Sequence, residues 1–187
     1  MEPFISIQEY LKKSIEEQGT APMCLSTITK DGFPNSRFVD LKSVNADELL
    51  FGTDIRSTKS KEFSKKNRVA VCIWNKKQAI QIRIIGKIKP ADNEISDKIF
   101  SSRNITAQAI ANVSIQSEDL VDINDLKMKV ATFIAASNGK IERPKTWCIY
   151  RIIPKEIEIL KFTDDRIHNR ILYKKKNDVW ISKQLSP

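Results

Sequence analysis

The chain has 187 residues, of which 41% are hydrophobic and 29% are charged, as in an ordinary globular domain. No apolar run approaches the roughly 18 to 20 residues that cross a bilayer, which excludes a membrane-spanning helix. The net charge of +9, from 32 basic and 23 acidic residues, favours anionic partners: nucleic acid, acidic lipid or a phosphorylated small molecule.

The whole chain reads as one domain, because no Pro/Gly-rich linker or shift in composition divides residues 1–187. Within it we expect an N-terminal helix in residues 1–20 and C-terminal strands in residues 146–187. The first residues lack the segments of a secretory signal, so we expect a cytoplasmic protein. Three scattered cysteines in apolar surroundings indicate reduced thiols, and with a single histidine we expect no metal site.

The first predicted element is an amphipathic helix over residues 6–18, where apolar residues recur at helical intervals. Ser6 and Glu9 have the spacing of a capping box at its start, and Gly19 marks its end. Short β-rich segments follow at residues 23–29, 37–42, 48–53, 68–74 and 79–89. Asp31-Gly32, between the first two, predicts a tight hairpin turn.

The last β-rich segment of this series alternates cleanly, with isoleucines on one face and Gln81 and Arg83 on the other. Beyond it we predict helices over residues 93–101 and 125–136, then strands over 146–153 and 157–162 and around Ile171 and Trp180. Strands joined by tight turns, then helices, then strands again indicate a mainly β (α+β) antiparallel barrel with peripheral helices.

Ser57 and Lys59 form a candidate anion site. Ser57 precedes a helix-compatible stretch over residues 58–65, and its hydroxyl could cap that helix. The helix dipole and the charge of Lys59 would both attract an anion to the free N–H groups at the helix start. The alternative is a helix start with no ligand.

Arg166, His168 and Arg170 are spaced at i, i+2 and i+4, so in an extended segment they project from the same side. Three neighbouring cations repel one another unless solvent or an anion separates them. The row is therefore either a solvated edge or a surface that faces an anionic substrate.

Arg37 and Lys42 flank a strand whose interior includes Phe38 and Val39. Because an odd number of positions separates them, their side chains should point to opposite faces of the strand unless a bulge intervenes. The alternative to a binding role is a pair of charges at the rim of an edge strand. Nucleic acid is not favoured as a partner, since the tryptophans are isolated in apolar strands rather than interleaved with arginines.

Several blocks of sequence, in this order, resemble the pyridoxamine 5'-phosphate oxidase family from Ala21 to Pro187. The blocks are APMCLSTITKDGFPNSRFVDLK, FGTDIRSTKSKEF, NRVAVCIW, QIRIIGK, VSIQSEDL and RIHNRILYKKKNDVWISKQLSP. The resemblance implies an FMN-binding split β-barrel that works as a homodimer, with FMN in clefts between the subunits.

The resemblance also implies residue roles. Arg37 and Lys59 match ligands of the FMN phosphate. Gln81 matches the residue that recognises the flavin ring, and Arg170 matches a basic group near that ring. Gln116 and Ser117 match a pair contributed from across the dimer. The remaining cofactor positions implied by the match are Phe38, Val39, Lys42, Thr53 and Ser57.

For the substrate, Lys42 and Arg103 match positions that hold its phosphate, while Arg166 and His168 match the catalytic pair that faces the pyridine ring. In the family reaction, a hydride passes from the substrate to the flavin, and dioxygen then reoxidises the flavin with release of hydrogen peroxide. The product of the family reaction is pyridoxal 5'-phosphate.

The chain departs from the family pattern on both sides of this site. Ile99 and Ala107 stand where the substrate-phosphate pocket usually has hydroxyl-bearing residues. On the flavin side, Gly52 replaces an aromatic residue, Thr58 an arginine and Leu160 a tryptophan. Two alternatives therefore stay open: a flavin oxidase like that of phenazine biosynthesis, acting on a dihydro-aromatic substrate, and a flavin-binding module without enzymatic activity.

Overall fold

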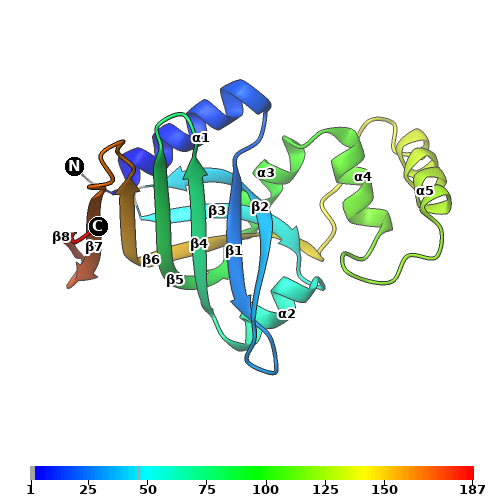
Figure 1. Cartoon of the computed structure of the whole chain (residues 1–187). Helices are drawn as coiled ribbons and strands as arrows, with labels where there is room; N and C mark the ends of the chain where they lie inside the picture. Colours follow the sequence, from blue (N-terminus) through cyan, green and yellow to red (C-terminus); the bar gives the residue numbers. More distant parts are fainter. Residues whose placement is uncertain (1–2, 46) are drawn as a thin grey trace.

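The computed structural model describes residues 3–45 and 47–187, and its main feature is one antiparallel sheet of eight strands (Figure 1). The strands follow the order β3-β2-β1-β4-β5-β6-β7-β8, and a further pairing of β3 with β6 closes six of them into a barrel. The strands are β1 (Pro22–Ile28), β2 (Pro34–Asn45), β3 (Glu48–Asp54), β4 (Arg68–Asn75), β5 (Ile80–Pro90), β6 (Trp147–Lys161), β7 (Asn169–Lys176) and β8 (Val179–Leu185).

The predicted alternation of apolar and polar residues builds the inside of the barrel. On β5, Ile82 and Ile84 are almost completely buried, while Arg83 between them is exposed. Neighbouring strands add Leu25 and Phe51 to the same core. Because successive side chains of a strand point to opposite faces, each strand also presents a second row on the outer face of the barrel.

In residues 3–45 and 47–187, five helices lie outside the sheet. They are α1 (Phe4–Gln18), α2 (Thr58–Lys65), α3 (Asn93–Ser101), α4 (Ile105–Val113) and α5 (Ile123–Ala136). Figure 1 shows α1 lying across one end of the barrel, and its Phe4, Ile7 and Tyr10 join the barrel core. The pair α4 and α5 lies at the other side of the view from the β7–β8 hairpin. None of the described helices is long and apolar enough to cross a membrane.

Most predicted elements are present, with ends shifted by a few residues. Gly19 ends α1 in the left-handed conformation, at φ 70°, which glycine adopts without steric cost. The Asp31-Gly32 prediction is confirmed: the turn joins β1 to β2, and Gly32 has φ 89°. Arg37 is partly buried and Lys42 is exposed. The pairing of β2 with β3 is irregular between Leu41 and Ser43, so the bulge that the prediction left open does occur at Lys42.

Four local predictions were wrong or incomplete. The capping box at Ser6 does not form, because the helix already begins at Phe4 and Ser6 lies inside its first turn. The helix α4 was not predicted. The two strands predicted at 146–153 and 157–162 are one continuous strand, β6, since the irregular pairing between Ile85 and Gly86 accommodates the proline at its middle. Finally, α5 begins at Ile123, before the predicted start at residue 125, and it has no fully buried residue.

Candidate functional site

The start of α2 forms the first part of the site. Ser57 has the extended conformation of a residue preceding a helix, but its hydroxyl makes no capping bond. It donates instead to the carbonyl oxygen of Asp54, at 2.8 Å. The expected side-chain cap at Ser57 is therefore absent, and the first N–H groups of α2 are not occupied by it.

Lys59 is a buried cation surrounded by neutral oxygens. Its ammonium nitrogen lies 3.0 Å from the hydroxyl of Thr53, 3.2 Å from that of Ser57 and 3.1 Å from Oε1 of Gln116. Only 7% of the residue is exposed. Burial, and next the nearby charge of Arg37, lower the pKa of Lys59 to about 8. A buried ammonium whose bonded partners are all neutral suits a site for an anion.

The segment after α4 completes this cluster from within the same chain. Gln116 contacts both Thr53 and Lys59, and the backbone N–H of Thr58 lies 3.5 Å from Oγ of Ser117. Ser117 takes the left-handed conformation, with φ 73°. The sequence-based expectation placed Gln116 and Ser117 across the dimer. In the structure they reach the start of α2 of their own chain, because the connection between α4 and α5 folds back over it.

Arg37 reaches into the same region from β2. Its guanidinium contacts the hydroxyl of Thr27 and forms an ion pair of 2.9 Å with Glu62 of α2. Burial by itself raises the pKa of Glu62, but hydrogen bonds from Thr27, Asn35 and Arg37 outweigh it and hold that pKa below its usual range. The carboxylate therefore stays charged and fixes the position of the guanidinium. Sequence reasoning missed this role of Glu62.

Arg103 provides a second, partly buried cation in this part of the molecule. Its guanidinium carbon lies 5.5 Å from the ring centre of Phe100 and 4.9 Å from that of Trp147. Its Nη1 is buried and has no hydrogen-bond partner among the described residues. Arg103 lines a cavity of about 220 Å³ whose wall also includes Thr53 and Gln116. Two residues that bond Lys59 therefore also line the cavity of Arg103.

Trp147 explains the glycine at position 52. A Cβ atom on Gly52 would lie 2.3 Å from Cζ2 of Trp147, which is far too close. The indole therefore occupies the space beside β3 that a larger residue at position 52 would need. Trp147 is a second residue that the sequence reasoning did not connect to the site, since β3 and β6 are distant in sequence.

A separate group of predicted site residues lies across β5, β6 and β7. In the pairing register, Gln81 lies opposite Leu160, and Leu160 opposite Arg170. Nε and Nη2 of Arg170 donate to Oε1 of Glu158, at 3.2 and 3.0 Å, and Nη1 donates to the carbonyl oxygen of Ser186. Glu158 was also missed, although its alternation with apolar residues along β6 indicated a polar outward position.

Arg166 and His168 do not form an extended row with Arg170. Both lie in the connection between β6 and β7, and Arg166 has the left-handed conformation, with φ 66°. Nδ1 of His168 accepts a hydrogen bond of 3.2 Å from the backbone N–H of Thr163, and its ring packs against Phe162. The prediction of a shared strand face was therefore wrong, because only Arg170 belongs to β7.

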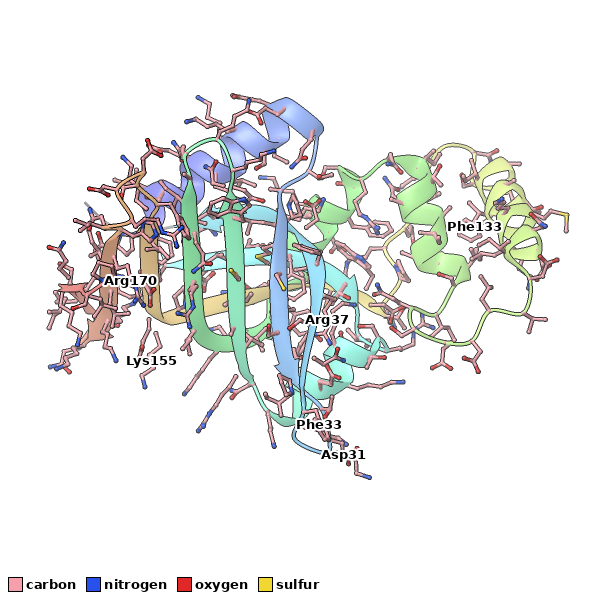
Figure 2. The ribbon with its side chains drawn as sticks, in the orientation of Figure 1. Asp31, Phe33, Arg37, Phe133, Lys155 and Arg170 are labelled. Atoms are coloured by element: carbon pink, nitrogen blue, oxygen red, sulfur yellow. The ribbon has the colours of Figure 1, made fainter. Side chains whose placement is uncertain are left out.

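Three further predicted site residues lie on β2 and do not contact Lys59: Phe38, Val39 and Lys42. Phe38 points outward and is 74% exposed, whereas Val39 packs partly against the barrel core. Lys42 forms an ion pair with Asp40 on the outer side. Figure 2 shows Arg37 near the middle of the view and Arg170 at its left. Within one chain, the predicted residues therefore form two groups rather than one closed pocket.

The sequence matches two family models. Residues 7–135 match the model described as pyridoxamine 5'-phosphate oxidase, and residues 147–187 match the pyridoxine 5'-phosphate oxidase C-terminal dimerisation region. A pyridoxine/pyridoxamine 5'-phosphate oxidase of Legionella pneumophila is 35% identical over 92% of this chain and 80% of its own length. The Haemophilus influenzae protein of that name is 33% identical over 99% of this chain and 89% of its own.

Solved structures agree with the fold. PhzG from Burkholderia lata, solved in complex with tetrahydrophenazine-1-carboxylic acid, superposes with a TM-score of 0.91 at 26% identity, covering 100% of this chain and 93% of the other. A pyridoxamine 5'-phosphate oxidase-related, FMN-binding protein from Nostoc punctiforme has a TM-score of 0.82 at 18% identity, covering 100% and 99%. The second likeness bears on the fold alone.

The barrel, its C-terminal dimerisation region and these matches define a homodimeric FMN-dependent oxidoreductase with a split-barrel fold. Within that class, the chain belongs to the pyridoxamine 5'-phosphate oxidase family.

Proposed function

We propose that this protein oxidises pyridoxine or pyridoxamine 5'-phosphate to pyridoxal 5'-phosphate with bound FMN, passing electrons to dioxygen. One observation carries the proposal: the buried Lys59 bonds Thr53 and Gln116, and these two residues line one cavity with the partly buried cation Arg103. A reaction between a phosphorylated cofactor and a phosphorylated substrate needs two such anion sites close together. The names of the curated relatives agree with this assignment.

The cluster at the start of α2 fits the phosphate of FMN. Lys59 and Arg37 supply two positive charges, and a phosphate dianion placed between them would offset the cost of burying Lys59. Thr53, Ser57 and Ser117 add short hydroxyl groups that can donate to phosphate oxygens. When bound, FMN would accept a hydride from the substrate and deliver the electrons to dioxygen, which yields hydrogen peroxide.

The remaining residues would hold the substrate against the flavin. Arg103 binds the substrate phosphate through its free Nη1, and Lys42 adds a second charge once it leaves Asp40. Arg170 is held by Glu158 near Gln81 and Leu160, where it would contact the flavin ring. Arg166 and His168 approach the pyridine ring from the β6–β7 connection, so their final positions depend on how that connection settles on the substrate.

A second copy of the chain joins the two groups of residues. The group around Lys59 and the group around Arg170 lie apart within one chain (Figure 2). The C-terminal dimerisation region contains Arg166, His168 and Arg170. We infer that this region of one subunit completes the site that begins at Lys59 of the other. We also infer that residues 1–187 act as a single domain in the cytoplasm.

A phenazine-type oxidase is the main alternative function. It is favoured by the similarity to PhzG and by Ile99 and Ala107, which offer no side-chain hydroxyl to a substrate phosphate. Arg103 suits an anionic substrate of either kind, because a guanidinium pairs with a phosphate or a carboxylate. The names of the curated relatives favour the phosphorylated substrate. A flavin-binding module without turnover remains the second alternative.

Anaerobic reduction of the bound flavin distinguishes these functions. The FMN-loaded protein is mixed without oxygen with pyridoxine 5'-phosphate, pyridoxamine 5'-phosphate, unphosphorylated pyridoxine or a dihydrophenazine carboxylate, and the flavin absorbance is followed. We expect bleaching by the phosphorylated vitamers, slowed in the Arg166→Ala and His168→Ala variants. Bleaching by the dihydrophenazine alone would establish the alternative oxidase, and no bleaching by any of them would leave a binding module.

A further inference from the structure

Two cysteines face each other on the outer side of the barrel. Cys24 of β1 lies directly opposite Cys72 of β4 in the antiparallel pairing. Their neighbours Met23, Leu25 and Val71 point into the core, so both thiols point outward. Both cysteines are free and partly exposed.

The pairing brings the two thiols within reach of a disulfide. Directly opposed residues of antiparallel strands have Cα atoms about 4.5 to 5.5 Å apart, and disulfides span Cα distances of roughly 4.4 to 6.8 Å. We propose that Cys24 and Cys72 form a redox-active dithiol that peroxide converts into a disulfide between β1 and β4. Cys148, the third cysteine, lies on β6 and has no part in this pair.

The oxidation is a two-electron step that needs only a peroxide. The thiolate of one cysteine attacks an oxygen of hydrogen peroxide, the O–O bond breaks, and a sulfenic acid and one water form after proton transfer. The second thiol then attacks that sulfur, the S–S bond forms, and the oxygen leaves as a second water. Both sulfur atoms are oxidised, and the peroxide is reduced to two waters.

The surroundings affect the reactivity of Cys72. Burial, and next the proximity of Cys24, raise the pKa of Cys72, while Arg83 opposes this shift. The raised pKa keeps less of Cys72 in the thiolate form that attacks peroxide. The pair also lies near Trp74 and Gln81, which face each other on β4 and β5. Under the proposed function peroxide would be released near this face, but the dithiol itself does not depend on that function.

The test uses the whole reduced protein and added hydrogen peroxide. After treatment, free thiols are alkylated and the protein is digested for mass spectrometry. We expect two of the three thiols to become unreactive, a mass loss of two hydrogens, and a linked peptide containing Cys24 and Cys72. Cys148→Ser should still form the link, and dithiothreitol should reverse it.

Cysteine variants distinguish a specific Cys24–Cys72 disulfide from unspecific oxidation of the thiols. Cys24→Ser and Cys72→Ser should each form no intrachain disulfide. The proposal is overturned if all three thiols of the wild-type protein stay reactive under conditions that oxidise free dithiothreitol. It is also overturned if the disulfide joins two chains on a non-reducing gel. The wild-type measurement alone decides this, so a poorly folded variant does not affect the outcome.

Discussion

The ammonium group of Lys59 donates a hydrogen bond of 3.1 Å to the side-chain oxygen of Gln116, although 57 positions separate the two residues in sequence. This bond ties the segment after α4 to the start of α2. The three groups that bond this ammonium, on Thr53, Ser57 and Gln116, are all neutral, so no bonded group compensates its buried charge.

The affinity for FMN should fall at alkaline pH because Lys59 loses its proton. Its pKa lies at about 8 in the flavin-free protein, below the ordinary lysine value of 10.5, so the free site loses its charge as the pH rises through 8. Bound phosphate favours the charged form, so affinity should drop up to about tenfold per pH unit above 8. Fluorescence titrations with FMN between pH 6.5 and 9.5 measure this.

Lys59→Arg is the matched control for that titration, because a guanidinium remains charged over the whole range. The variant should bind FMN with an affinity that changes little above pH 8. Equal pH dependence in the wild-type protein and in Lys59→Arg would contradict the assignment to Lys59.

Replacing Arg103 should weaken the binding of the phosphorylated substrate and leave the binding of FMN unchanged. Hydrogen bonds to charged groups contribute about 1.5 to 3 kcal/mol, so Arg103→Met should raise KM for pyridoxine 5'-phosphate about 10- to 100-fold. The preference over unphosphorylated pyridoxine should shrink by the same factor, while the Kd of FMN stays within about twofold. An unchanged preference would place the substrate phosphate elsewhere.

Glu158 should act as a positioning residue for Arg170. Glu158→Gln removes the charge that holds the guanidinium at 3.0 Å, and misplacement near the reacting ring should slow anaerobic flavin reduction about 10- to 100-fold. The control is Glu156→Gln. Glu156 lies two residues before Glu158 on β6 and forms an equivalent ion pair of 3.0 Å with Lys174 of β7. Equal rates in the two variants would mean that Glu158 has only a structural role.

Gly52 and Trp147 should be energetically coupled. Gly52→Ala places a methyl group against the indole and should destabilise the protein by about 1 to 3 kcal/mol in urea unfolding. Trp147→Phe removes the two colliding ring atoms, so Gly52→Ala should cost far less in that background. Simple additivity of the two changes would show that the backbone, and not the indole, makes position 52 intolerant of a side chain.

Local rules of the backbone explain what could be predicted. Strand alternation placed Ile82 and Ile84 inside the barrel, and the left-handed preference of glycine placed the end of α1 at Gly19. The cationic start of α2 was also predictable, because the helix start and Lys59 belong to one short segment. By contrast, the prediction that Arg166, His168 and Arg170 share one face was wrong, because their spacing does not show whether the segment is extended.

The sequence by itself determined the barrel class, the family and the cationic start of α2, because alternation, helical periodicity and short motifs are properties of neighbouring residues. Only the tertiary structure decided that Gln116 meets Lys59, that Glu62 holds Arg37 and that Trp147 fills the space beside Gly52. These contacts depend on strand register and barrel closure, which are set by the packing of the whole core and not by any local segment.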